Sequence, residues 1–126
     1  MNNVVICEAN EINLKSTLDG GQAFRWHGKE DSYRGVIEDK VYIIFREENL
    51  INAKCINSKI DSAELLKIKR YLGIDFNLDN FKKKYKKNGY IYKLIKQNQG
   101  LRILKQDPWE SIVSFITSSV SNISKI

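Results

Sequence analysis

Few residues in this chain of 126 have the type and spacing for chemistry. His27 is the only histidine, and it follows Trp26 in a polar stretch typical of a solvated loop. Cys7 and Cys55 lack metal-ligand spacing, so we interpret them as reduced core thiols, with a disulfide as the less favoured alternative. Phosphate-loop and dinucleotide glycine patterns are absent. The sequence therefore predicts no catalytic residue, no metal and no small-molecule cofactor.

The stretch DGGQAFRW, residues 19–26, could recognise a ligand rather than transform one. Its Asp-Gly-Gly start is a turn signal, and Gly21 would also let the backbone approach a bound group closely. The alternation in QAFRWHG predicts a strand with Phe24 and Trp26 on the core face. Arg25 then lies on the other face, as a phosphate contact or a surface charge.

Charge is distributed unevenly along the chain. The net charge is +6, yet residues 81–106 hold nine basic residues and no acid, against 12 basic and 15 acidic residues elsewhere. The nine are Lys82, Lys83, Lys84, Lys86, Lys87, Lys93, Lys96, Arg102 and Lys105. This asymmetry favours a polyanionic partner, nucleic acid or a membrane surface, although a solvated helical face explains it equally well. Three tyrosines interleave with the lysines as in single-strand stacking platforms, but their helical spacing favours packing: Tyr85, Tyr90 and Tyr92.

The elements that position these residues change character along the chain. Residues 3–57 contain the short runs NVVICE, EINLKSTL, QAFRWHG, YRGVIE, VYIIFR and LINAKCIN, separated by polar turns. In the second run, Ile12 and Leu14 alternate onto one face. Five or six strands with tight connections predict an antiparallel meander.

Residues 61–126 are predicted to be helical. An Asp61–Glu64 capping box begins the first helix and Gly73 ends it; a second begins near Asp79, and a third, YIYKLIKQNQ, stops at Gly100. LRILKQ links these to a last helix that opens with the cap and first-turn residues Asp107, Pro108 and Glu110. Strands followed by helices predict an α+β fold with helices on one face of the sheet.

The last helix carries an apolar stripe at helical spacing, formed by Trp109, Ile112, Val113, Ile116, Val120 and Ile123. We expect part of the stripe to dock on the sheet. The part from Val120 onward is expected to need residues that this chain does not have, so self-association through the exposed helix is a further expectation. No run of 18 apolar residues and no secretory leader occur, which predicts a cytoplasmic protein without a membrane partner.

Two blocks resemble one known family, the 8-oxoguanine DNA glycosylases. DGGQAFRW ahead of YRGVI resembles the family's N-terminal signature, and LRILKQDPWESIVSFITSSVSNISKI (101–126) resembles its entry into the helix-hairpin-helix catalytic domain. The resemblance implies that residues 1–106 form an N-terminal domain like one repeat of the TATA-binding-protein fold. Residues 107–126 would begin the helical domain, and the lysine nucleophile and its aspartate would lie beyond Ile126.

The resemblance also implies a function, removal of 8-oxoguanine from duplex DNA by base flipping and Schiff-base chemistry. Gly21 matches the glycine whose carbonyl accepts a hydrogen bond from N7–H of 8-oxoguanine, and Phe115 matches an aromatic residue of the lesion pocket. The implied DNA-binding positions are Gln22, Arg25, Ser118, Ser119, Asn122 and Lys125. The chain alone would be inactive, and the complete enzyme would be nucleoid-associated in a bacterium.

Two positions depart from the family pattern. Val120 stands where the family has an asparagine that contacts the cytosine left by the flipped purine, and valine cannot make that hydrogen bond. Lys125 stands where eukaryotic members have an arginine, so the bidentate fork is lost. These departures predict an enzyme that tolerates other bases opposite the lesion. Alternative interpretations are an alkylpurine glycosylase fragment, a stand-alone nucleic-acid-binding module using residues 81–106, and a folded remnant without function.

Overall fold

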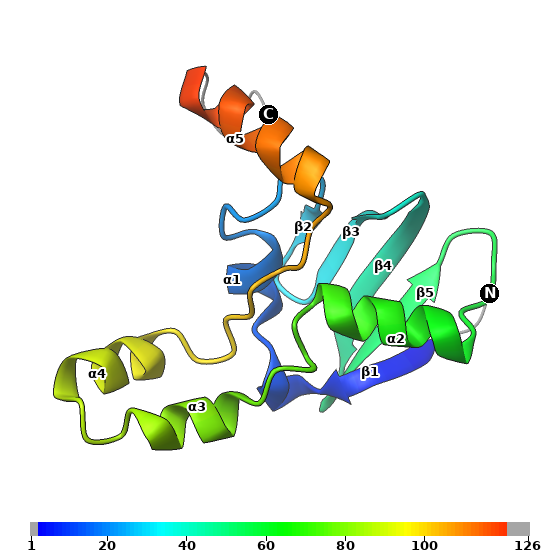
Figure 1. Cartoon of the computed structure of the whole chain (residues 1–126). Helices are drawn as coiled ribbons and strands as arrows, with labels where there is room; N and C mark the ends of the chain where they lie inside the picture. Colours follow the sequence, from blue (N-terminus) through cyan, green and yellow to red (C-terminus); the bar gives the residue numbers. More distant parts are fainter. Residues whose placement is uncertain (1–2, 121–126) are drawn as a thin grey trace.

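A computed structural model describes residues 3–120 of the chain. Five antiparallel strands form one sheet in the order β1-β5-β4-β3-β2 (Figure 1). The strands are β1 (Val4–Glu8), β2 (His27–Lys29), β3 (Ser32–Ile37), β4 (Lys40–Glu47) and β5 (Leu50–Cys55). Their pairing is that of the predicted meander, except that the first strand crosses to the far side of the last. A β-bulge interrupts β1 between Val5 and Cys7.

The helices are a 3-10 turn η1 (Ala9–Glu11), α1 (Leu14–Leu18), α2 (Ser62–Tyr71), α3 (Leu78–Lys84), α4 (Gly89–Gln97) and α5 (Pro108–Val120). Asp61 caps α2 by accepting a hydrogen bond from Glu64 N at 2.8 Å, and Gly73 follows it with φ +72°. None of the helices in the described residues is long and apolar enough to cross a membrane.

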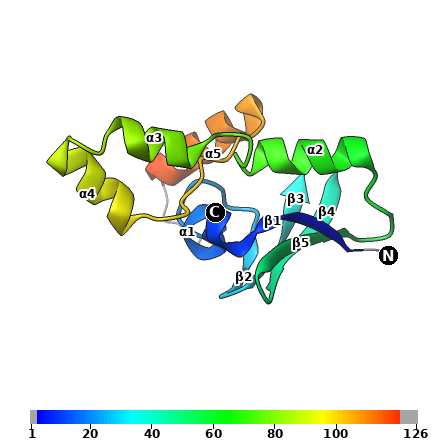
Figure 2. The same cartoon turned by 90° about the horizontal axis from the view of Figure 1, so that it is seen from below.

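The core lies between one face of the sheet and helices α1 and α2 (Figure 2). Alternate strand residues such as Tyr33, Ile44 and Ile51 point into it, while Leu18 and Ile68 pack from the two helices. Cys7 and Cys55 are both free and buried there, as predicted. The predicted α+β class with helices on one face is therefore confirmed.

Two predicted strands are wrong. The run EINLKSTL contributes to η1 and forms α1, because Asn13 caps the helix through a 2.9 Å bond from Ser16 N to its side chain. Ile12 and Leu14 are both buried, but Leu14 and Leu18 share a face by helical spacing, so the alternation was misleading. Of QAFRWHG, only the last two residues enter β2; the preceding loop bonds to a distant segment instead.

Trp26 in that loop is a core residue, as predicted, whereas Phe24 is only half-buried. The indole packs directly over Gly35 of β3, where a Cβ atom would overlap the ring. Its Nε1 donates a 3.0 Å hydrogen bond to the hydroxyl of Tyr71 at the end of α2. A glycine in mid-strand is thus explained by the aromatic ring that takes its place.

Helix α5 begins as predicted, since Asp107 accepts a 3.0 Å hydrogen bond from Glu110 N. The expectation that part of its apolar stripe docks on the sheet is wrong. Because α1 and α2 already cover the core face, α5 projects from the body of the domain (Figure 1). Its large apolar side chains remain 44–73% exposed: Trp109, Ile112, Val113, Phe115 and Ile116. Expectations for residues 121–126 lie outside the described residues.

Candidate functional site

The loop between α1 and β2 contains two glycines that are needed for different reasons. A Cβ atom on Gly20 would overlap the carbonyl oxygen of Ser16, so only glycine allows the chain to leave α1 at this point. Gly21 has φ +96°, in the region that other residues avoid, but nothing lies within 4 Å of a Cβ placed there. Gly21 is exposed, so a ligand can approach its backbone.

The residue after Gly21 fixes this loop to the segment ahead of α5. Gln22 Nε2 donates to the carbonyl of Arg102 at 2.6 Å, and Gln22 Oε1 accepts from Leu104 N at 2.9 Å. Gln106 Nε2 in turn donates to the Gln22 carbonyl at 2.5 Å. Both groups of the Gln22 amide are thus occupied within the fold. Its predicted contact with DNA stays untested, and the role that the structure gives it is to hold the Gly21–Gln22 backbone.

Residues 100–106, which we name the linker, are themselves held in the core. Asn13 N donates to the Gly100 carbonyl at 2.7 Å, and Arg102 N donates to Thr17 Oγ1 at 3.1 Å. The Arg102 side chain, only 5% exposed, donates to the carbonyls of Glu11, Gly73 and Phe76 at 2.7, 3.1 and 2.6 Å. The linker therefore joins α1, the turn after α2 and the Gly21 loop into one hydrogen-bonded unit.

Arg25 connects the loop to the first turn of α5. Its Nη1 lies 3.2 Å from Glu110 Oε1, with both side chains partly exposed. The ion pair borders a cavity of about 940 Å³ between the loop, α2 and α5, lined in part by Phe24, Tyr71 and Trp109. Burial raises the pKa of the Tyr71 hydroxyl above its ordinary value. The cavity has aromatic and charged walls that could bind a ligand. The Arg25 guanidinium is already paired with the Glu110 carboxylate.

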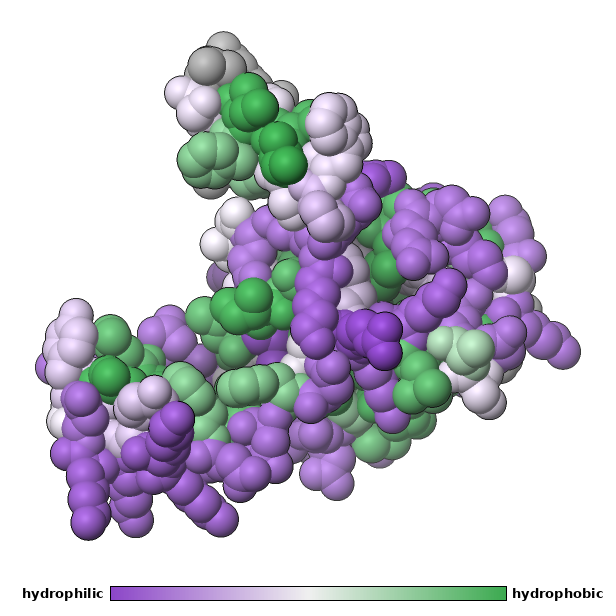
Figure 3. Space-filling model, viewed as in Figure 1, coloured by the Kyte–Doolittle hydropathy of each residue, from purple (hydrophilic) through white to green (hydrophobic). Residues whose placement is uncertain are grey.

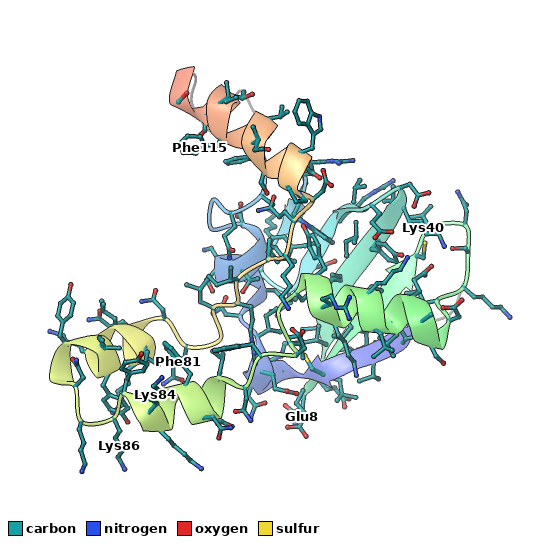
Figure 4. The ribbon with its side chains drawn as sticks, viewed as in Figure 1. Glu8, Lys40, Phe81, Lys84, Lys86 and Phe115 are labelled. Atoms are coloured by element: carbon teal, nitrogen blue, oxygen red, sulfur yellow. The ribbon has the colours of Figure 1, made fainter. Side chains whose placement is uncertain are left out.

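Phe115 and the two predicted serines lie further along α5. Phe115 is five residues beyond Glu110, about 7.5 Å along the helix axis, and is 73% exposed (Figure 4). Ser118 Oγ donates to the Phe115 carbonyl at 2.8 Å and Ser119 Oγ to the Ile116 carbonyl at 2.7 Å. Their oxygens can still accept, and Ser119 is exposed. Asn122 and Lys125 lie outside the described residues.

Within residues 3–120 the structure gathers no set of groups for catalysis. No cluster of three histidine, cysteine or acidic side chains able to hold a metal occurs among them. His27 is exposed on β2 opposite Arg34, and none of the described lysines is buried. Burial raises the pKa of the Cys7 thiol to about 12, which removes it as a nucleophile at neutral pH. The described arrangement can bind and orient a ligand, but it has no activated nucleophile.

The roles of Arg102 and Gln106 in holding the linker and the Gly21 loop were not predicted from the sequence. Arg102 appeared there as one of nine charges in a basic segment, whereas it is buried and bonded to three carbonyls. Its partners lie 26 or more residues away, so no signal near Arg102 in the sequence predicted its burial. Lys105, another of the nine, pairs with Asp75 at 3.0 Å.

Comparison with known proteins defines the class. Residues 4–112 match the family model for the N-terminal domain of 8-oxoguanine DNA glycosylase. The chain belongs to this family, since the match covers most of its length and the loop, linker and start of α5 lie within it.

The relatives include proteins named as N-glycosylase/DNA lyase and 8-oxoguanine glycosylase/lyase. The N-glycosylase/DNA lyase of Saccharomyces cerevisiae is 33% identical over an alignment of 129 positions, which covers 93% of this chain and 34% of the yeast protein. The structure of MBOgg1 with a low affinity DNA ligand matches with a TM-score of 0.81 at 31% identity, over 99% of this chain and 43% of that one. The apo 8-oxoguanine glycosylase/lyase of Clostridium acetobutylicum matches with a TM-score of 0.82 at 27% identity, over 98% and 43%. The chain thus spans about a third of the curated relative's length.

Proposed function

We propose that this chain forms the damage-reading N-terminal part of an 8-oxoguanine DNA glycosylase/AP lyase. The observation that supports this proposal is the Gly21 loop. Gly21 is exposed, and hydrogen bonds between Gln22 and the linker hold the residue that follows it. The chain also belongs to this family. A fixed carbonyl that accepts from N7–H of 8-oxoguanine discriminates it from guanine, which lacks that hydrogen. Pre-organisation matters because a mobile carbonyl would lose entropy on binding.

The partner we propose is duplex DNA containing oxidised guanine, with Phe115 at the flipped base and the serines near the backbone. A Clostridium acetobutylicum relative has been crystallised with double-stranded DNA that carries cytosine opposite 8-oxoguanine, and it matches this chain with a TM-score of 0.76 at 28% identity. Residues 107–126 begin the helical domain in this proposal. We also propose a cytoplasmic, nucleoid-associated location in a bacterium, which the proposed DNA substrate supports.

The Schiff-base step is assigned to residues outside this chain. Desolvation in an apolar pocket makes a lysine neutral and nucleophilic at pH 7, and none of the described lysines is buried in this way. The 126-residue chain, incubated with 8-oxoguanine duplex and borohydride, is therefore expected to give no covalent adduct. A trapped adduct would show that an amine of this chain performs the step.

The Gly21 assignment is tested in a chimera that joins this chain to the remaining helical part of the Clostridium acetobutylicum enzyme. Gly21→Ala strains a backbone with φ +96° and is expected to move the carbonyl. Losing one hydrogen bond costs about 1–3 kcal/mol, or roughly five- to 160-fold in excision. Gly89→Ala is the matched control, because Gly89 is exposed, also has free space around a Cβ atom and lacks a positive φ. Equal 8-oxoguanine excision by the two variants would contradict the proposal.

Opposite-base tolerance is a second expectation for the chimera carrying this chain's α5 sequence. Val120 and Lys125 predict comparable excision of 8-oxoguanine opposite C, T, G and A. A strong preference for cytosine would refute that expectation. Self-association is also proposed, through the exposed apolar face of α5.

A further inference from the structure

The basic segment 81–106 defined by the sequence does not form one surface in the structure. Helices α3 and α4 and their connecting turn form a hairpin, residues 78–97, which we name the basic hairpin (Figures 1 and 2). In both views it extends beyond the body of the domain, away from the β5–α2 connection. Arg102 and Lys105 do not belong to it. It carries seven lysines and one acid, Asp79: Lys82, Lys83, Lys84, Lys86, Lys87, Lys93 and Lys96.

No lysine of the basic hairpin forms an ion pair within the described residues. The four ion pairs found within residues 3–120 involve Arg25, Lys40, Lys67 and Lys105. Lysines in the last turns of α3 and α4 gain from the helix dipole, but Lys86, Lys87 and Lys93 lie outside a last turn. Like charges this close repel one another, so they are a cost to folding. A partner that neutralises them removes that cost.

The hairpin also presents its cations in restricted geometry. Lys84 Nζ lies 5.7 Å from the centre of the Tyr85 ring and Lys96 Nζ 5.1 Å from that of Tyr92. The Phe81 ring packs at a tilt against the rings of Phe76 and Tyr85, with ring centres 5.8 and 4.9 Å apart. Side chains held against rings lose less conformational entropy when they bind a phosphate. The predicted packing role of the tyrosines thus applies to Tyr85, whereas Tyr90 is 74% exposed.

We propose that the basic hairpin is a second nucleic-acid contact, which binds the phosphate backbone of undamaged duplex DNA outside the lesion site. Duplex DNA carries one negative charge per about 1.7 Å of its axis, so a row of lysines can bind in many registers without reading sequence. Figure 3 shows the hydrophilic side chains of this region projecting from the edge of the molecule, and Figure 4 shows Lys86 pointing away from the body. Such a surface concentrates the protein on DNA rather than selecting damage.

The expected salt dependence of DNA binding follows from counterion release. Each phosphate neutralised adds about −0.9 to the slope of log K against log salt. Three lysines in contact give a slope of about −2.7, which weakens binding about 40-fold between 50 and 200 mM salt. The test variant is Lys83→Gln, Lys86→Gln and Lys87→Gln, all exposed positions. The control is Lys29→Gln, Lys54→Gln and Lys59→Gln, which removes the same charge away from the hairpin.

The experiment measures fluorescence anisotropy of a labelled, undamaged 20-base-pair duplex with the 126-residue chain and both variants over this salt range. The hairpin variant is expected to lose about 2.7 from the slope, and the control to keep the wild-type slope, with circular dichroism confirming that both fold. Equal slopes in all three, equal losses in both variants, or binding of phosphatidylserine vesicles but not of DNA would each overturn the proposal. The DNA carries no lesion, so the inference goes beyond the proposed function and its outcome is independent of the Gly21 assignment.

Discussion

Replacing Arg102 with methionine tests whether the linker is held by this one buried cation. Methionine fills a similar length without donors, so the carbonyls of Glu11, Gly73 and Phe76 lose their bonds to it. The Gly73 carbonyl keeps another partner, Phe76 N at 3.2 Å, which leaves two carbonyls unpaired. An unpaired buried polar group costs about 1–3 kcal/mol. The Glu11 and Phe76 carbonyls are only partly buried, so we expect the free energy of unfolding to fall by about 2–4 kcal/mol.

The assay is urea unfolding followed by circular dichroism, with the loss taken from the midpoint at constant slope. Arg70→Met is the control, because Arg70 is an exposed residue of α2, and its effect is expected to stay within about 0.5 kcal/mol. Arg102→Lys is expected to fall between the two, since one ammonium cannot reach three carbonyls from separate segments. A loss below about 1 kcal/mol for Arg102→Met would refute the reasoning, because water would then be replacing the guanidinium.

Three further outcomes are expected. The Cys7 thiol, with its pKa raised to about 12 by burial, should resist iodoacetamide at pH 8 until urea unfolds the chain, as intact mass would report; rapid native labelling would contradict this. A hydrogen bond from Lys105 lowers the pKa of Asp75 below 3.8. The ionised carboxylate therefore stabilises the fold fully above that pH, and this contribution is lost on acidification. The difference in Tm between wild type and Asp75→Asn should shrink below about pH 4, and a constant difference would refute the pairing. Exposed Trp109 and Ile112 should drive self-association, so Trp109→Glu with Ile112→Lys should lower the weight-average mass in light scattering of concentrated samples. A wild type that is a monodisperse monomer at high concentration would count against it.

Local chemistry explains why the outline of the fold could be predicted. Asp61 with Glu64, Gly73, and Asp107 with Pro108 are boundary signals whose physics lies within one helical turn, and each marks an observed helix end. Strand alternation in β3 and β4 was similarly readable because one face is buried and the other is only half-covered.

The remainder depended on partners distant in sequence. Nothing near Gln22 indicates that its amide bonds to Arg102 and Leu104, more than 75 residues away, and these bonds replace the strand expected there. Helix α1 is stabilised by the burial of Leu14 and Leu18 against the sheet. A five-residue segment is too short for its own sequence to predict a helix. Gly21 could be singled out from its motif, but the linker that holds it could not.

The edges of the sheet determine how this protein behaves when concentrated. An exposed strand edge is a template for adding strands from other copies, and it leads to fibrils when it is long and flat. Here the outer strand β1 is interrupted by its bulge between Val5 and Cys7, and β2 at the other edge is three residues long and ends in Lys29. Neither edge offers a regular ladder, so we expect contacts between copies to form through exposed apolar side chains such as those of α5. Crowding should therefore yield reversible, helix-mediated oligomers that dissolve on dilution, and no cross-β aggregate that binds thioflavin T.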